Sequence, residues 1–167
     1  MALRILVAED HAPLRHLTCR TLERRPGFQP IEAADGLEAL RIAGDQQPDL
    51  ILLDLNLPKL NGFEVAKRMR ALVPYAHVLF MSEESSPEIV RHALSLGARG
   101  YIQKADAARD LLSGIDAVLA GNRFVSPSLG IDVLARLKPR PSASAPDASV
   151  RENRGAGRAP GNADRRG

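Results

Sequence analysis

Leu50-Ile51-Leu52-Leu53-Asp54 is the segment of the chain that says most about its fold. Four consecutive apolar residues leave no polar face, which is typical of a central strand that helices cover on both sides of a parallel sheet. A carboxylate follows at once, at a point where an unpaired charge would be costly. This stretch therefore predicts a central parallel strand with a functionally important aspartate at its carboxyl end.

Further apolar segments surround this strand and alternate with helical patterns. We expect the other strands at residues 3–8, 28–33, 78–81 and 100–102. Apolar residues at helical spacing predict helices within residues 14–22, 36–43, 62–72, 89–94 and 111–119. Because strands and helices alternate strictly, we expect right-handed crossovers between parallel strands of one sheet, with helices on both of its faces. The predicted fold is an α/β, doubly wound sheet of five parallel strands in the flavodoxin-like order 2-1-3-4-5, with five flanking helices.

The overall composition is that of a soluble α/β domain. Of the 167 residues, 44% are apolar, but only 4% are aromatic and none is Trp, so the core must be aliphatic. The single cysteine, Cys19, cannot form an internal disulfide, which favours a reducing compartment. No apolar run reaches membrane-spanning length, and no signal peptide follows Met1. We therefore expect a cytoplasmic protein without membrane contacts.

The net positive charge lies in the last part of the chain. Residues 139–167 contain six arginines and three acidic residues, whereas residues 1–138 contain 17 basic and 17 acidic side chains. The neutral body offers no electrostatic argument for nucleic-acid binding. Pro, Ala, Ser, Gly and Arg dominate the last part, which cannot bury enough apolar surface to fold. We predict a folded domain over residues 1–122, a short segment over 123–138 with room for one helix, and a disordered tail over 139–167.

Polar side chains stand where four of the predicted strands end. Glu9 and Asp10 follow the first strand, Asp54 follows the third, Ser82 ends the fourth and Lys104 lies just past the fifth. These four strands are neighbours in the predicted order, so their carboxyl ends converge on one crevice. Clustered carboxylates repel one another unless a cation binds, and Mg²⁺ suits oxygen ligands. With such an ion, Asp54 can act as a nucleophile toward phosphorus, while Lys104 and the Ser82 hydroxyl stabilise the phosphoryl oxygens.

Each of these residues also has a purely structural explanation. Acidic residues at strand ends often cap the next helix, a lone lysine is usually solvated, and a serine in this place is ordinarily a turn residue. The coincidence of all of them at the proper strand ends favours the functional interpretation.

Three segments carry a resemblance to a known family. They are Ile5-Leu6-Val7-Ala8-Glu9-Asp10-His11, Pro48-Asp49-Leu50-Ile51-Leu52-Leu53-Asp54-Leu55-Asn56-Leu57-Pro58 followed by Gly62, and Gly97-Ala98-Arg99-Gly100-Tyr101-Ile102-Gln103-Lys104. Over roughly residues 2–122 the chain resembles the receiver domains of response regulators, which are the phosphorylatable aspartate switches of two-component systems.

The resemblance implies a role for each site residue. Asp54 would be the phosphoacceptor, with Lys104 and Ser82 as phosphate contacts. Tyr101 matches the switch aromatic of the family, whose ring turns inward when Ser82 moves toward the phosphate. Its structural alternative is an edge-strand tyrosine that packs on the last helix. The implied Mg²⁺ ligands are Glu9, Asp10, Asp54 and the backbone carbonyl of Asn56.

Two departures from the family pattern are informative. The chain is similar to receivers that precede a LuxR-type helix-turn-helix, on the basis of Glu9-Asp10-His11, Lys104-Ala105 and residues 121–127. The expected DNA-binding domain is missing, because the 29 residues after Lys138 show no periodic apolar pattern. Glu83 stands beside Ser82, where the family favours a small residue. Its carboxylate would either slow phosphorylation by repulsion or point to solvent, and we expect the second because loop side chains turn outward readily.

The leading interpretation is a stand-alone response regulator that accepts a phosphoryl group on Asp54 from a sensor histidine kinase or a phosphotransfer protein. It would act on an unknown downstream protein, as a monomer or weak homodimer, without specific DNA binding. It would not be an enzyme beyond its own phosphorylation and dephosphorylation. An alternative is a truncated LuxR-type regulator that has lost DNA binding. A phosphatase of the haloacid-dehalogenase type is disfavoured, since that family needs a second aspartate where this chain has Asn56.

Overall fold

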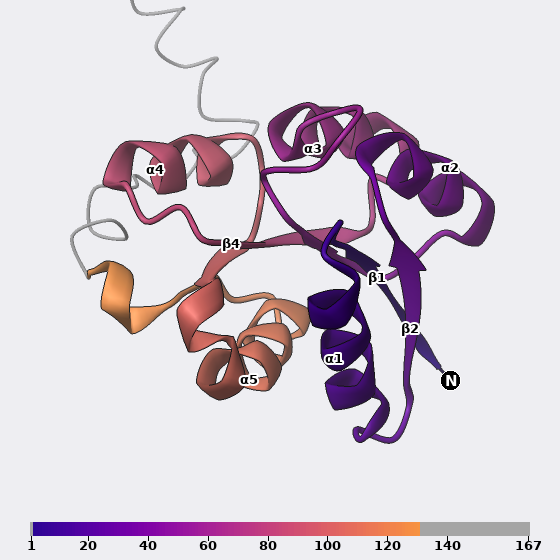
Figure 1. Ribbon diagram of the computed structural model, residues 1–167, viewed down its shortest axis with the longest axis horizontal. Coiled ribbons are helices and arrows are strands. Elements are labelled where there is room, and N and C mark those ends of the chain that lie inside the picture. The colour runs from indigo at the N-terminus through magenta and orange to yellow at the C-terminus, as the bar shows by residue number, and fades with distance from the viewer. Residues whose placement is uncertain (1, 131–167) are drawn as a thin grey trace, which may run out of the picture. The chain divides into compact units, whose positions relative to one another are not determined.

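Strands and helices alternate through residues 2–130, the part of the chain that the structure, a computed structural model, describes (Figure 1). The strands are β1 (Leu3–Ala8), β2 (Phe28–Ala33), β3 (Leu50–Leu53), β4 (His77–Ser82), β5 (Gly100–Gln103) and β6 (Phe124–Val125). The helices are α1 (Ala12–Glu23), α2 (Gly36–Gln46), α3 (Gly62–Leu72), α4 (Pro87–Ser95) and α5 (Ala107–Leu119), with 3-10 turns η1 (Lys104–Asp106) and η2 (Pro127–Leu129). No helix in the described range is long and apolar enough to cross a membrane.

The strands form one parallel sheet in the order β2-β1-β3-β4-β5-β6. Figure 1 shows α1 and α5 on one face of this sheet and α2, α3 and α4 on the other. The prediction of a doubly wound sheet in the order 2-1-3-4-5 is therefore confirmed, and β6 extends it by one short strand.

Local signals start and stop the helices that follow the strand ends. The Asp35 side chain accepts a hydrogen bond from Glu38 N at the start of α2 (2.8 Å), and Asn61 accepts one from Glu64 N at the start of α3 (3.1 Å). Such caps satisfy backbone donors that have no partner inside the helix. Gly97 ends the turn after α4 with a φ of +101°, a conformation that favours glycine.

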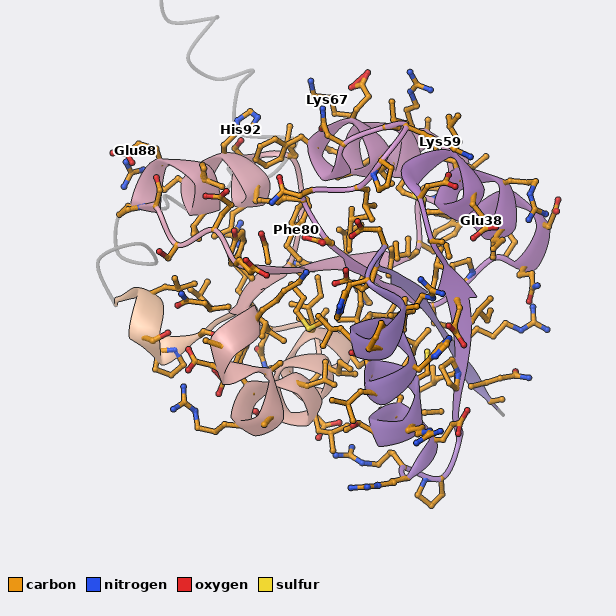
Figure 2. All side chains as sticks on the ribbon, viewed as in Figure 1. Glu38, Lys59, Lys67, Phe80, Glu88 and His92 are labelled. Atoms are coloured by element: carbon orange, nitrogen blue, oxygen red, sulfur yellow. The ribbon has the colours of Figure 1, made fainter. Side chains whose placement is uncertain are left out.

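The core is aliphatic, as the composition predicts. Alternate side chains of β1, β3, β4 and β5 pack against α1 and α5: Ile5, Val7, Leu50, Leu52, Leu79, Met81 and Ile102 meet Leu22, Ile115 and Val118. On the other face lies the fully buried Phe80, which Figure 2 labels. Its ring packs edge to face with the ring of Phe63 from α3, at 6.1 Å between ring centroids. Burial on both faces holds β3 rigidly, and with it the residue that follows.

The sixth strand is built into the sheet by close contacts. A Cβ on Gly100 would lie 2.4 Å from the carbonyl oxygen of Phe124, and a Cβ on Gly114 would lie 3.0 Å from the Phe124 ring. The fully buried Ser126 donates its backbone N–H to Tyr101 O (3.0 Å), and its hydroxyl accepts from Gln103 N (3.1 Å). The sheet thus continues past residue 122, the predicted end of the folded domain. Residues 131–138 and the predicted disordered tail over 139–167 lie outside the described residues.

Phe124→Ala in the full chain is expected to lower the free energy of unfolding by about 2 kcal/mol, because the half-buried ring fills the space above Gly114. Urea unfolding followed by far-UV circular dichroism measures the change. Arg123→Ala, at the exposed neighbouring position, is the control and should stay within about 0.5 kcal/mol. Equal stabilities of the two variants would show that β6 contributes nothing to the domain.

Candidate functional site

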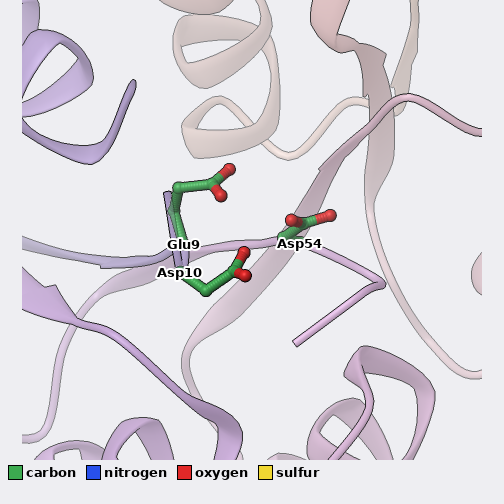
Figure 3. A group of neighbouring side chains, drawn as sticks. All are labelled: Glu9, Asp10 and Asp54. Carbon is green, nitrogen blue, oxygen red and sulfur yellow. The ribbon is translucent and has the colours of Figure 1, made fainter. Parts of the chain in front are cut away.

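Four strands deliver the predicted site residues to the same edge of the sheet. The register pairs Ala8 with Leu53, Leu53 with Phe80, and Ser82 with Gln103, so β1, β3, β4 and β5 end side by side. Glu9 and Asp10 therefore follow β1 next to Asp54, which follows β3. Figure 3 shows these three carboxylates gathered where the two strands end.

The three carboxylates are close enough to share one cation. One oxygen from each of Glu9, Asp10 and Asp54 lies within 4.8 Å of the others; Glu9 and Asp54 are buried and Asp10 is exposed. All the donors are carboxylate oxygens, which suit a hard divalent ion such as Mg²⁺. They border a cavity of about 350 Å³ whose walls are formed by Glu9, Asp10, His11, Leu14, Asp54, Asn56, Glu83 and Lys104.

Lys104 joins two of the carboxylates. Its Nζ lies 2.6 Å from Glu9 Oε1 and 2.9 Å from Asp54 Oδ2. Burial alone would lower the pKa of Lys104, but the hydrogen bonds to Glu9 and Asp54 outweigh it and raise the pKa above its usual value. Burial also raises the pKa of Glu9, and the Lys104 hydrogen bond opposes that shift. Three carboxylates against one ammonium leave the site two negative charges in excess, which a divalent cation would offset.

The backbone at Asp54 is held from both sides. Asp54 N donates to Ala8 O (3.1 Å), and Gly62 N donates to Leu55 O (2.8 Å). A Cβ on Gly62 would lie 2.3 Å from the carbonyl oxygen of Asp54, so this close approach requires glycine. Asn56 N donates to Asp54 Oδ1 (3.3 Å), which orients the carboxylate. The role of Gly62 did not follow from its place in the sequence motif, because it depends on a contact between the start of α3 and the end of β3.

Ser82 and Tyr101 are linked through the loop after β4. Both are fully buried. Glu84 N donates to Ser82 Oγ (3.2 Å), and Tyr101 OH donates to Glu84 O (2.7 Å). Burial raises the pKa of Tyr101 to about 12, so its hydroxyl stays protonated and remains a donor. The predicted switch residue therefore lies inward in this structure.

Two polar wall residues of the cavity, His11 and Glu83, are not among the predicted site residues. His11 borders the cavity, and its backbone N–H donates to Glu9 Oε2 (3.0 Å), which orients that carboxylate. Glu83 is exposed, in accord with the expectation that it reaches solvent, yet it also lines the cavity. The position of Glu83 beside Ser82 in the sequence indicates that it lies near the site, but a loop sequence does not specify whether the side chain faces the cavity.

The structure thus combines a doubly wound sheet with an acidic crevice at the carboxyl ends of its strands, where a buried aspartate pairs with a lysine. A family model described as the response regulator receiver domain matches residues 5–116. The chain belongs to this family, the receiver domains of two-component systems.

Curated relatives of the chain are regulators of transcription. A putative transcriptional regulator of Pseudomonas aeruginosa is 36% identical over 119 residues, which are 71% of this chain and 57% of that protein. The transcriptional activator protein ExaE of Pseudomonas putida is 34% identical over 136 residues, 81% of this chain and 64% of that protein. The chain thus spans about three fifths of the length of these relatives.

Solved structures of receivers are similar to this fold over nearly their whole length. A LuxR-family two-component response regulator from Aurantimonas is 32% identical, with a TM-score of 0.75 over 81% of this chain and 97% of that one. The receiver domain of the putative response regulator NarL from Mycobacterium tuberculosis is 30% identical, with a TM-score of 0.68 over 72% of this chain and 98% of that one.

Proposed function

We propose that this chain is the phosphoacceptor of a two-component phosphorelay, in which Asp54 accepts a phosphoryl group from a histidine of a sensor kinase or a phosphotransfer protein. One observation carries this proposal. A buried aspartate ends a central strand, lies 2.9 Å from the Lys104 ammonium, and shares a cluster with Glu9 and Asp10. Family membership supports the same conclusion.

The residues divide the chemistry between them. An Asp54 carboxylate oxygen attacks phosphorus while the phosphorus–nitrogen bond of the donor breaks, and the imidazole nitrogen keeps the electron pair. The Lys104 ammonium already lies beside the carboxylate and stabilises the negative oxygens of the phosphoryl group. The Ser82 hydroxyl, which accepts from Glu84 N in this structure, would donate its proton to one of these oxygens.

A divalent cation has a natural place in this chemistry. Bound Mg²⁺ supplies charge neutralisation for the carboxylates and for the incoming phosphoryl oxygens. The residues that would hold it are Glu9, Asp10, Asp54 and the backbone carbonyl of Asn56. Glu9 and Asp54 are positioned by Lys104, His11 and the backbone of Asn56 before any ion binds.

The output follows from the link between Ser82 and Tyr101. Movement of Ser82 toward a phosphoryl group would carry Glu84 with it and shift the hydrogen bond that holds Tyr101. The face formed by α4, β5 and α5 would change as a result and present a different surface to a downstream protein. The chain would catalyse only its own phosphorylation and dephosphorylation.

A second candidate is the receiver part of a transcriptional regulator, which the names and lengths of the curated relatives favour. Both candidates share the chemistry of Asp54 and differ in the output that it serves, a downstream protein or the control of transcription. A titration of the full chain with varied duplexes at two salt concentrations tests whether this chain itself reads DNA, because specific readout gives a sequence preference that survives added salt. Under the first proposal we expect no such preference.

Mg²⁺ is expected to stabilise the folded chain by mass action, by about 1.4 kcal/mol at ten times its Kd. This corresponds to a rise in Tm of about 4–6 °C for a domain of this size. Asp10→Asn should remove most of that rise, since it deletes one of the three clustered carboxylates. Differential scanning calorimetry with and without Mg²⁺ measures the shift. Asp45→Asn, at an exposed position on α2, is the matched control and should keep the full rise; an undiminished shift in Asp10→Asn would place the ion elsewhere.

A further inference from the structure

One wall of the cavity carries a charge that the proposed chemistry does not use. Glu83 lines this wall directly after Ser82, and its side chain is exposed. The ion pairs among the described residues engage Glu9 and Asp54 but not Glu83. Its carboxylate therefore borders the approach to Asp54 without a cation to offset it.

The main chain keeps Glu83 at this place. On one side, Ser82 is fully buried and its Oγ accepts from Glu84 N at 3.2 Å. On the other side, the carbonyl of Glu84 accepts from the buried Tyr101 hydroxyl at 2.7 Å. With both neighbours tied to buried groups, the backbone at position 83 cannot swing away from the cavity while these bonds hold.

The charges around the cavity show what Glu83 adds. Glu9, Asp10 and Asp54 against Lys104 sum to two negative charges. A bound divalent cation brings that sum to zero, so the negative charge of Glu83 is what an incoming anion still meets. Phosphoryl donors are anions, and they differ in how much charge they carry.

We propose that Glu83 is a specificity-determining residue that discriminates among phosphoryl donors by their net charge and disfavours the more negative ones. This inference rests on the proposed function of Asp54. In transfer from acetyl phosphate, an Asp54 oxygen forms a bond to phosphorus while the phosphorus–oxygen bond to acetate breaks, and acetate leaves with the electron pair. Phosphoramidate follows the same course with ammonia as the leaving group, but it enters as a monoanion at neutral pH, whereas acetyl phosphate enters as a dianion.

Coulomb's law sets the size of the effect. In water, a unit negative charge about 8 Å from an incoming donor slows the reaction of a monoanion about twofold and that of a dianion about fivefold. Glu83→Gln removes the charge at nearly constant shape. At low ionic strength and saturating Mg²⁺, it should accelerate phosphorylation about fivefold with acetyl phosphate and about twofold with phosphoramidate. Both gains should shrink toward none in about 0.5 M NaCl, where the screening length is a few ångströms.

Two further variants of the full chain complete the experiment, with initial rates followed by intact-protein mass spectrometry. Glu83→Asp keeps the charge and should match the wild type. Glu88→Gln makes the same change of charge in the first turn of α4, away from the cavity wall, and should also leave both rates unchanged (Figure 2).

Equal rates for Glu83→Gln and the wild type with both donors would overturn the inference. So would a gain that is the same for the two donors, that persists in high salt, or that Glu88→Gln reproduces. A wild-type chain that accepts no phosphoryl group from either donor and binds no fluoroberyllate would instead refute the proposed function itself. Phosphorylation of the wild type therefore separates the two failures.

Discussion

Asp54→Asn is expected to abolish phosphorylation, with a fall in initial rate of at least about 1,000-fold. The amide keeps the shape of the side chain but has no anionic oxygen to attack phosphorus. Incubation with acetyl phosphate and Mg²⁺, followed by intact-protein mass spectrometry, measures the uptake. In the wild type we expect one added phosphoryl group that is lost in acid, as an acyl phosphate should be.

Asp49→Asn is the matched control for this experiment. Asp49 directly precedes β3, whereas Asp54 directly follows it, and Asp49 is exposed. The Asp49 carboxylate accepts a hydrogen bond from Arg4 N at 2.8 Å, and the amide oxygen of an asparagine can accept the same bond. This variant should be phosphorylated like the wild type. Uptake at the normal rate and at the same peptide in Asp54→Asn would show that the acceptor is a different residue.

Lys104→Met is expected to lower the free energy of unfolding by about 3–5 kcal/mol at pH 7 without Mg²⁺. The substitution keeps most of the side-chain volume but removes the cation that Glu9 and Asp54 share, at 2.6 and 2.9 Å. Both carboxylates are buried, so each would keep a charge without its partner. Urea unfolding measures the loss, and Lys67→Met on the exposed face of α3 (Figure 2) should cost less than about 0.5 kcal/mol.

The deficit of Lys104→Met should depend on pH in a defined direction. Burial already raises the pKa of Glu9 in the wild type, and without the lysine that pKa rises further above its unfolded value. A carboxylate with a raised pKa in the folded state favours folding when it is protonated. The deficit should therefore shrink as the pH falls from 7 through the folded-state pKa of Glu9. The double variant Glu9→Gln, Lys104→Met should recover part of the lost stability at pH 7, because it also removes one of the buried carboxylates. A loss of less than about 1 kcal/mol in the free energy of unfolding of Lys104→Met would contradict a structural role for the contacts of Lys104 with these carboxylates.

Much of the fold could be predicted because parallel sheets leave a direct mark on the sequence. Leu50 to Leu53 are all buried, as four apolar residues in a row predict. Glu9, Asp54, Ser82 and Lys104 could be placed together because parallel strands share one carboxyl edge, so the strand order alone brings their ends into contact. The resemblance to receivers then added the implied roles of these residues, which stay predictions.

Other features depend on contacts that no local pattern encodes. β6 has only two residues, too few for a periodic signal, and it exists because Gly100 and Gly114 leave room for Phe124. The inward position of Tyr101 depends on the Glu84 carbonyl, which the loop after β4 presents. The sequence allowed either direction for Glu83, and the loop geometry places it on the cavity wall.

The order of the elements, the parallel sheet and the set of polar residues at its carboxyl edge could all be read from the sequence. Periodicity and strand ends are properties of neighbours along the chain, which the sequence specifies directly. Tertiary packing, in contrast, specifies the pairing of Lys104 with both buried carboxylates, the attachment of β6 and the place of Glu83. Each of these is a contact between residues far apart in the chain or a side-chain direction in a loop, and packing against other elements selects it.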